Sequence, residues 1–146
     1  MKLHEVTLDN FGAYAHRRLE LEGAPVVLIY GENESGKTTA LNGIRQTLYG
    51  FELRTPYLTG QPMNGAAKLV TADGREVVFS RRKGREDTIT ATVDGSPVSS
   101  DTLNHLLCNL SLSEYQTLFG FSLDELRRGE EALRTAPLTH ALAGGG

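Results

Sequence analysis

The chain has 146 residues, a length typical of one domain with a hydrophobic core of its own. Hydrophobic residues make up 39% of it and the formal net charge is −3, so the overall composition does not indicate nucleic-acid or membrane binding. The single cysteine excludes an internal disulfide, and the absence of a signal peptide or a membrane-spanning apolar run predicts a cytoplasmic protein with no membrane partner.

The first predicted elements are strands. Strands are predicted at residues 3–8 and 18–22, on either side of a short connection at residues 10–14, and apolar and polar residues alternate in the second of them. A third strand is expected at residues 26–30, where the run Val-Val-Leu-Ile-Tyr is continuous and largely β-branched. Such runs are typical of strands buried on both faces of a parallel sheet.

A phosphate-binding motif follows this third run directly. Residues 31–38 fit G-x-x-x-x-G-K-S/T, in which glycines let the backbone turn its N–H groups toward phosphate oxygens at a helix N-terminus. Lys37 would reach the β- and γ-phosphates, and Thr38 would place its hydroxyl on Mg²⁺. The predicted nucleotide-binding residues are Gly31, Asn33, Glu34, Ser35, Gly36, Lys37, Thr38 and Thr39.

The residues after the motif predict a helix. Leu41, Ile44 and Leu48 recur at helical spacing, and Gly50 ends the pattern. The order strand, loop and helix is the one that phosphate binding needs, so the motif favours a nucleotide site over a turn that binds nothing. Residues 51–65 contain prolines and glycines without a period and are expected to form a loop beside this site.

An antiparallel meander is predicted next, with strands at residues 67–72, 75–82 and 88–93. Its turns are Asp73-Gly74 and Asp94-Gly95, since Asp-Gly between alternating runs is a strong hairpin signal.

The pattern becomes helical from Ser100 onward. One apolar stripe is formed by Leu103, Leu106, Leu107 and Leu110. Cys108 lies among these leucines and is expected to be a small core residue. Two capping boxes follow, Ser111-x-x-Glu114 and Ser122-x-x-Glu125, and each predicts the start of a helix.

Four stretches carry a family resemblance, at residues 2–14, 19–21, 30–39 and 119–129. Together they resemble the start of an SMC/SbcC-type ATPase head, and their sequences are most similar to the YhaN-like branch of bacterial double-strand-break-repair ATPases. The implied fold class is α/β, the N-terminal lobe of a P-loop NTPase of the ABC/SMC type. This lobe has a mixed sheet with an antiparallel β-meander, followed by C-terminal helices.

The resemblance implies an ATP-binding-cassette head that a long coiled coil divides, with residues 1–146 as its N-terminal lobe. The chain has no Walker B strand after residue 39 and no Leu-Ser-Gly-Gly signature. The aspartate that binds Mg²⁺ and the catalytic glutamate of the family would therefore lie in a C-terminal lobe. We expect a fragment that contributes Lys37 as its catalytic residue, takes ATP and Mg²⁺ as cofactors, and is inactive alone.

The chain departs from the family pattern at two places. Relatives carry a basic residue directly after the Asn-Phe pair, where this chain has Gly12. Arg17 or Arg18 could substitute, although both are more simply solvated strand charges. Relatives also place a glutamine that positions water and Mg²⁺ between the lobes. Gln116 and Ser122 are the candidates, although Gln116 falls on a short helix and Ser122 fits an N-cap.

A basic cluster at a predicted hairpin tip consists of Arg81, Arg82, Lys83 and Arg85. In the family, the β-rich lobe faces DNA between two heads, so these side chains are candidate contacts to the phosphates of duplex DNA. The alternative is a solubilising hairpin, because no aromatic side chains accompany the cluster and the chain is acidic overall.

Two functions follow from these patterns. In the first, two heads dimerise on ATP and act on DNA in repair or chromosome maintenance, with the C-terminal lobe, the second head, duplex DNA and a nuclease subunit as partners. In the second, the chain is a nucleotide-dependent switch or assembly module of another ABC or OLD-type ATPase.

Overall fold

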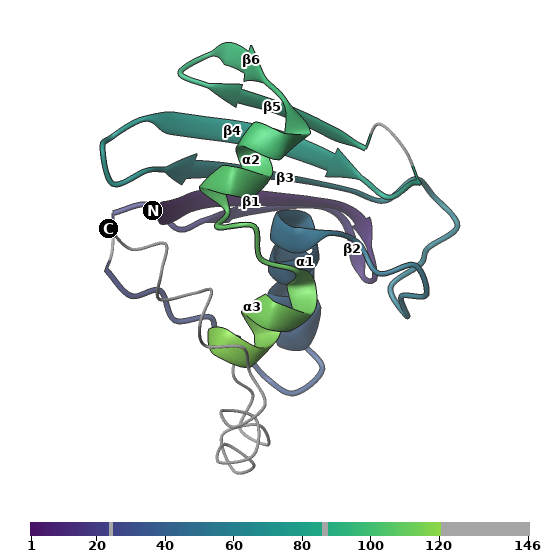
Figure 1. Ribbon diagram of the computed structural model, residues 1–146. Coiled ribbons are helices and arrows are strands. Elements are labelled where there is room, and N and C mark those ends of the chain that lie inside the picture. The colour runs from purple at the N-terminus through teal and green to yellow at the C-terminus, as the bar shows by residue number, and fades with distance from the viewer. Residues whose placement is uncertain (24, 86–87, 121–146) are drawn as a thin grey trace.

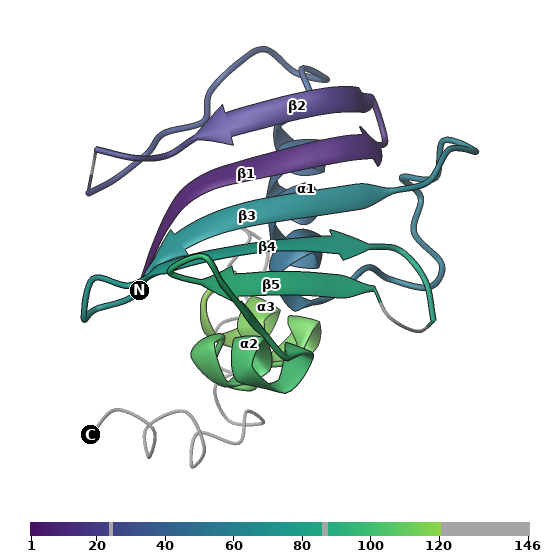
Figure 2. The same cartoon turned by 90° about the horizontal axis from the view of Figure 1, so that it is seen from above.

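Six strands form one antiparallel sheet in the computed structural model, which describes residues 1–23, 25–85 and 88–120. The strands are β1 (Lys2–Phe11), β2 (Tyr14–Glu20), β3 (Asn64–Val70), β4 (Glu76–Arg82), β5 (Ile89–Val93) and β6 (Ser96–Val98). Their order is β2-β1-β3-β4-β5-β6, so β1 pairs both with its hairpin partner and with the first strand of the meander (Figure 2). The two predicted hairpins and the meander are therefore confirmed.

The helices are α1 (Lys37–Tyr49), α2 (Ser100–Leu106) and α3 (Leu112–Leu118). Helices α1 and α2 cover one face of the sheet, and α3 packs beside α1 (Figure 1). Helix α1 ends at Gly50, as predicted, where a φ of 121° requires glycine. The capping box at the start of α3 is also confirmed, because Ser111 and Glu114 exchange both of its hydrogen bonds.

The core lies between this face of the sheet and the helices. Its buried side chains are Val6, Leu8, Phe11, Leu48, Met63, Ala67, Leu69, Val77, Phe79, Ala91, Leu103 and Leu107. Helix α1 approaches β1 and β3 unusually closely. A Cβ added at Gly43 would lie 2.4 Å from Leu8 Cδ1, and one added at Gly65 would lie 2.1 Å from Thr47 Oγ1. The two glycines therefore allow α1 to pack this closely against β1 and β3.

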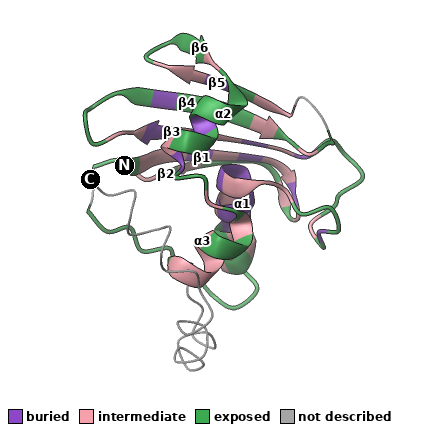
Figure 3. Cartoon of the chain, in the orientation of Figure 1, coloured by how far each residue is buried: buried purple, intermediate pink, exposed green. Residues whose placement is uncertain are grey.

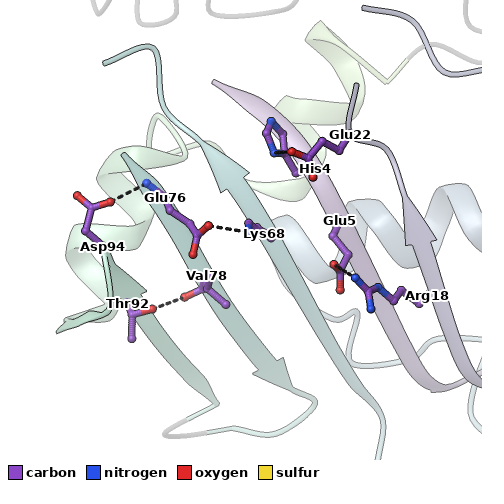
Figure 4. Close-up of polar contacts among 9 residues, drawn as sticks. All are labelled: His4, Glu5, Arg18, Glu22, Lys68, Glu76, Val78, Thr92 and Asp94. Atoms are coloured by element: carbon purple, nitrogen blue, oxygen red, sulfur yellow. Dashed lines mark hydrogen bonds and ion pairs between the residues drawn. The ribbon is translucent and has the colours of Figure 1, made fainter. Parts of the chain in front are cut away.

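The opposite face of the sheet is exposed, and two of its cations are paired with carboxylates. Lys68 Nζ lies 2.6 Å from Glu76 Oε2, and Arg18 Nη2 lies 2.7 Å from Glu5 Oε2 (Figure 4). The hydrogen bond to Glu76 raises the pKa of Lys68. Exposed pairs of this kind add little stability.

Residues 26–30 do not form the strand that their apolar run predicts. Val26 is 80% exposed, Leu28 80% and Tyr30 85%, and the exposed stretch continues to residue 35 (Figure 3). A strand buried on both faces needs a hydrogen-bonded neighbour in a sheet. None of the six described strands pairs with this segment.

The prediction for Cys108 is also wrong, because its side chain is exposed. Cys108 and Asn109 have φ values of 63° and 53°, so the backbone turns left-handed directly after α2. Helix α2 ends at Leu106, four residues before the last leucine of the predicted stripe, and the turn that follows leaves the thiol exposed. Within the described residues, no helix is long and apolar enough to cross a membrane.

Candidate nucleotide-binding site

The phosphate-binding motif forms a tight loop that ends at the first residue of α1. Glu34 and Gly36 have φ values of 65° and 93°, and Ser35 N–H donates to the carbonyl of Glu32 at 3.3 Å. A Cβ added at Gly31 would lie 2.7 Å from Ser35 Oγ, so this glycine allows the two ends of the loop to approach. Residues 31–35 are exposed, Asn33 among them, which leaves the loop accessible to a ligand.

The N-terminus of α1 differs from those of the other two helices. Ser99 caps α2 and Ser111 caps α3 with side-chain hydrogen bonds, whereas Gly36 at the N-cap of α1 has no side chain to offer. The first turn of α1 also carries no acidic residue. The N–H groups and the positive end of the helix dipole thus face the loop without a side-chain acceptor, which is the arrangement that favours a bound anion.

Lys37 adds a full positive charge at this point. Its Nζ donates to the carbonyls of Gly31 at 2.8 Å and Glu32 at 2.6 Å, so the ammonium group lies over the loop. Among the described residues, no carboxylate forms an ion pair with it. The charge is therefore held in place by neutral groups and remains available to an anion in the loop.

The two threonines have different surroundings. Thr38 is exposed in the first turn of α1, so its hydroxyl is accessible to a metal ion. Thr39 is half-buried, and its Cγ2 would lie 3.1 Å from a Cβ added at Gly12 in the turn between β1 and β2. Thr39 thus packs against this turn as well as belonging to the loop.

Tyr14 contacts the loop, a role that the sequence did not reveal. Its hydroxyl donates to the carbonyl of Gly36 at 2.9 Å, the same carbonyl that accepts the first helical hydrogen bond from Ala40 at 2.8 Å. A Cβ added at Gly36 would lie 2.8 Å from this hydroxyl. The β1–β2 hairpin therefore holds the last glycine of the loop, and only the position of Tyr14 three residues after the Asn-Phe pair could have indicated it.

The structure also explains the missing basic residue after the Asn-Phe pair. Gly12 has a φ of 57° and donates its N–H to the carbonyl of Tyr57 at 2.8 Å, and a Cβ there would lie 3.0 Å from the Tyr57 ring. A side chain here would have to adopt this left-handed backbone and displace the Tyr57 ring slightly, so glycine suits the position better than a basic residue. Arg18 pairs with Glu5 on the opposite face of the sheet, which agrees with a solvated strand charge, and Arg17 is exposed on the edge strand β2.

Gln116 lies on α3, alongside the second half of α1, and Ser122 and its predicted capping box lie outside the described residues. The rings of Tyr49 and Tyr115 stack with centroids 4.5 Å apart where the two helices meet. Burial, together with the neighbouring Tyr115 and Cys108, raises the pKa of Tyr49 to about 12, so this hydroxyl stays neutral. The structure does not bring Gln116 to the phosphate loop.

The basic cluster divides into two pairs. Arg81 donates from Nε and Nη2 to the carbonyls at residues 47 and 48 at 3.0 and 3.1 Å, and burial lowers its pKa. Lys83 donates to the carbonyls at residues 52 and 53. These two cations bind the C-terminal end of α1 and the chain after it, which favours cationic groups. Only Arg82 and Arg85 are exposed, so the cluster is less accessible than its sequence suggests.

Comparison with known proteins links the chain to one family. A protein-family model described as an AAA domain matches residues 1–141. The uncharacterised protein YhaN of Bacillus subtilis (strain 168) is 25% identical over 126 residues, which cover 84% of this chain. The chain spans only 13% of the length of YhaN.

Two solved structures share the fold. One, described as showing ATP-driven dimerization and DNA-stimulated activation of SMC ATPases, has a TM-score of 0.61 at 15% identity and covers 97% of this chain and 96% of its own. The other, the recombination mediator protein RecF with ATP, has a TM-score of 0.54 at 21% identity and covers 92% of this chain and 39% of its own. The predicted resemblance and the α/β P-loop ATPase fold are thereby confirmed.

Proposed function

Because the chain belongs to the AAA domain family, and its fold is that of SMC and RecF heads, we propose that residues 1–146 are the N-terminal, ATP-binding lobe of a DNA-maintenance ATPase head. The observation that carries the proposal is the uncapped N-terminus of α1 behind an accessible loop, with Lys37 held over it by carbonyls alone. A nucleotide's phosphates supply the negative charge that these groups favour.

The residues of the loop divide the work of binding. Lys37 neutralises charge on the β- and γ-phosphates, the loop N–H groups hold the phosphate oxygens, and Thr39 lies near the α-phosphate. Thr38 would offer one hydroxyl to a bound Mg²⁺, which would supply positive charge beside the phosphates. The described residues contain no group of three acidic, histidine or cysteine side chains that could hold a metal ion by itself. A Mg²⁺ that took one protein hydroxyl and otherwise phosphate oxygens would need no such group.

The exposed apolar run at residues 26–30 supports the proposal that a second lobe completes the head. Five successive large apolar side chains exposed before the phosphate loop need cover, since such patches mark contact surfaces. A C-terminal lobe that adds a neighbouring strand would bury them and would supply the carboxylates for hydrolysis. We infer a cytoplasmic protein whose heads dimerise on ATP, act on duplex DNA and work beside a nuclease subunit, while this lobe alone does not turn ATP over.

Replacing Tyr14 with phenylalanine tests whether the hairpin supports the loop. The change removes only the hydroxyl that holds the Gly36 carbonyl, and one such hydrogen bond contributes about 1 kcal/mol. We expect calorimetry to show Mg-ATP affinity reduced by roughly five- to tenfold. Tyr57→Phe is the matched control, because the Tyr57 hydroxyl accepts from Asn42 and does not contact the loop. Equal affinities for the two variants would remove Tyr14 from the site.

A further inference from the structure

A cavity lies at the C-terminal end of α1, away from the phosphate loop. It has a volume of about 390 Å³ and is bounded by the end of α1, by β4 and β5, and by the segment from α2 to the start of α3 (Figure 2). Helix α1 separates Lys37 from Tyr49 by about 18 Å along its axis, so the cavity and the nucleotide site do not overlap. A volume of this size is within the range of small-molecule pockets.

Part of the lining is apolar. Leu48 and Leu107 are buried there, and Ile89 and Leu110 are half-buried. These four side chains come from the end of α1, from β5 and from the chain that follows α2. Contact with them would remove apolar surface of a ligand from water, so this part of the lining favours an aliphatic group.

Arg81 brings a cation into the lining. Its Nε and Nη2 donate to the carbonyls at residues 47 and 48, and its Nη1 makes no hydrogen bond within the described residues. None of the ion pairs in the described chain includes Arg81. The C-terminal end of a helix carries about half a negative charge, so about half of the guanidinium charge stays uncompensated. Burial lowers the pKa of Arg81 because desolvation disfavours its charged form, and a bound anion would offset that cost.

Three neutral residues of the lining can also donate hydrogen bonds. The Tyr49 hydroxyl and the side-chain amides of Asn104 and Asn109 make no hydrogen bond within residues 1–23, 25–85 and 88–120. Burial, with the neighbouring Tyr115 and Cys108, raises the pKa of Tyr49 to about 12, so its hydroxyl keeps the proton that it would donate. The lining therefore combines one guanidinium with neutral donors, a set that suits an anionic group.

Glu114 limits how much negative charge the cavity accepts. Its carboxylate accepts from the Ser111 N–H at 2.8 Å and from the Ser111 hydroxyl at 2.7 Å, as part of the capping box of α3. It also belongs to the lining. A dianion such as a phosphate monoester would meet repulsion from this carboxylate with only one partly compensated cation to balance it, so a ligand with a single negative charge fits better.

We propose that this cavity binds a small molecule with one carboxylate group on a branched aliphatic body. Arg81 binds the carboxylate, Tyr49, Asn104 and Asn109 complete its hydrogen bonds, and the apolar part of the lining covers the body. The proposal goes beyond the proposed ATPase function and does not depend on it, because none of these residues belongs to the phosphate loop.

Ligand-observed saturation-transfer NMR on the full-length protein that contains this lobe tests the proposal, with 4-methylpentanoate as the probe. We expect a Kd of roughly 1–10 mM, typical of a probe of about eight non-hydrogen atoms. The uncharged amide of the same shape, 4-methylpentanamide, should bind roughly tenfold more weakly or less. Equal binding of the two probes would overturn the proposal, and so would tighter binding of 3-methylbutyl phosphate than of the carboxylate.

The variants locate the probe. Arg81→Met should raise the Kd of 4-methylpentanoate by roughly tenfold or more, whereas Arg75→Met, an arginine that pairs with Asp73 before β4, should leave it within about twofold. Because Arg81 also supports α1, Asn104→Asp is the second variant. It keeps the shape of the side chain, adds a negative charge to the lining, and should raise the Kd by roughly threefold or more.

An unchanged Kd in Arg81→Met would overturn the proposal, and if that variant does not fold, an unchanged Kd in Asn104→Asp decides in the same way. Lys37→Ala should bind the probe as the wild type does, and a signal lost in this variant would place the probe at the phosphate loop and overturn the proposal. A protein that binds 4-methylpentanoate but not ATP would refute the proposed function alone, so the two failures are distinguishable.

Discussion

Lys37→Ala is expected to abolish the binding of Mg-ATP and Mg-ADP. The change removes the only full positive charge that the described structure holds over the loop. Charge-assisted hydrogen bonds to phosphate are roughly twice as strong as neutral ones, so losing them at both the β- and γ-phosphates should reduce affinity by roughly a hundredfold or more. Isothermal titration calorimetry measures this directly.

The fold should tolerate this substitution. The two bonds that Lys37 makes are to carbonyls of exposed residues, so thermal unfolding of the variant should resemble that of the wild type. Lys68→Ala is the matched control, because it removes a lysine of the same charge from the far face of the sheet. Unchanged ATP affinity in Lys37→Ala would refute the assignment of the loop as a nucleotide site.

Arg82→Ala combined with Arg85→Ala is expected to weaken duplex DNA binding by the full-length protein, uniformly across sequences. The two side chains are exposed at the β4–β5 hairpin, and each DNA phosphate that is no longer neutralised should lower the slope of log affinity against log salt by roughly 0.9. A salt titration at fixed ATP should therefore show a slope reduced by about 1.8 for the double variant. ATP affinity should not change.

The internal control for this prediction comes from the same cluster. Arg81→Ala should lower thermal stability more than it changes the salt slope, because Arg81 binds carbonyls at the C-terminal end of α1. Arg75→Ala, at the opposite end of the meander and paired with Asp73, should change neither. If the Arg82 and Arg85 variant keeps the wild-type slope, the hairpin is a solvated tip and the DNA-binding surface lies elsewhere.

Local patterns were sufficient to predict most of the fold. The Asp-Gly pair at residues 94–95 does adopt the two left-handed conformations that a tight hairpin needs, and Gly50 does end α1. The capping box at Ser111 lies at the predicted helix start. Each of these signals acts within a few residues, so contacts with the rest of the protein do not change the local structure that it predicts.

Predictions that depended on contacts between residues far apart in the sequence were less successful. The apolar run at residues 26–30 reads as a buried strand, yet a strand also needs a neighbour, and the described chain provides none. Arg81 and Arg82 are equivalent in the sequence, but they point to opposite faces of β4, and only the sheet pairing decides which one meets α1.

The sequence was sufficient to predict the phosphate-binding loop of the candidate site, but not the side chains that hold the loop in place. A motif specifies Lys37 and Thr38 because the chemistry of phosphate binding needs those residue types at that spacing. Tyr14 acts on the loop from a contact that forms only after β2 has packed beside α1. Its hydrogen bond to a backbone carbonyl leaves no trace in the pattern of residues.

ATP turnover, measured side by side for residues 1–146 alone and for the full-length protein at saturating Mg-ATP, decides whether this chain is one part of a divided ATPase site. We predict negligible turnover by the lobe, and turnover by the full-length protein that rises per mole with protein concentration as heads dimerise. Binding without turnover in both would favour the nucleotide-dependent switch module instead. Turnover by the lobe alone that equals that of the full-length protein would contradict the division of the site between two lobes.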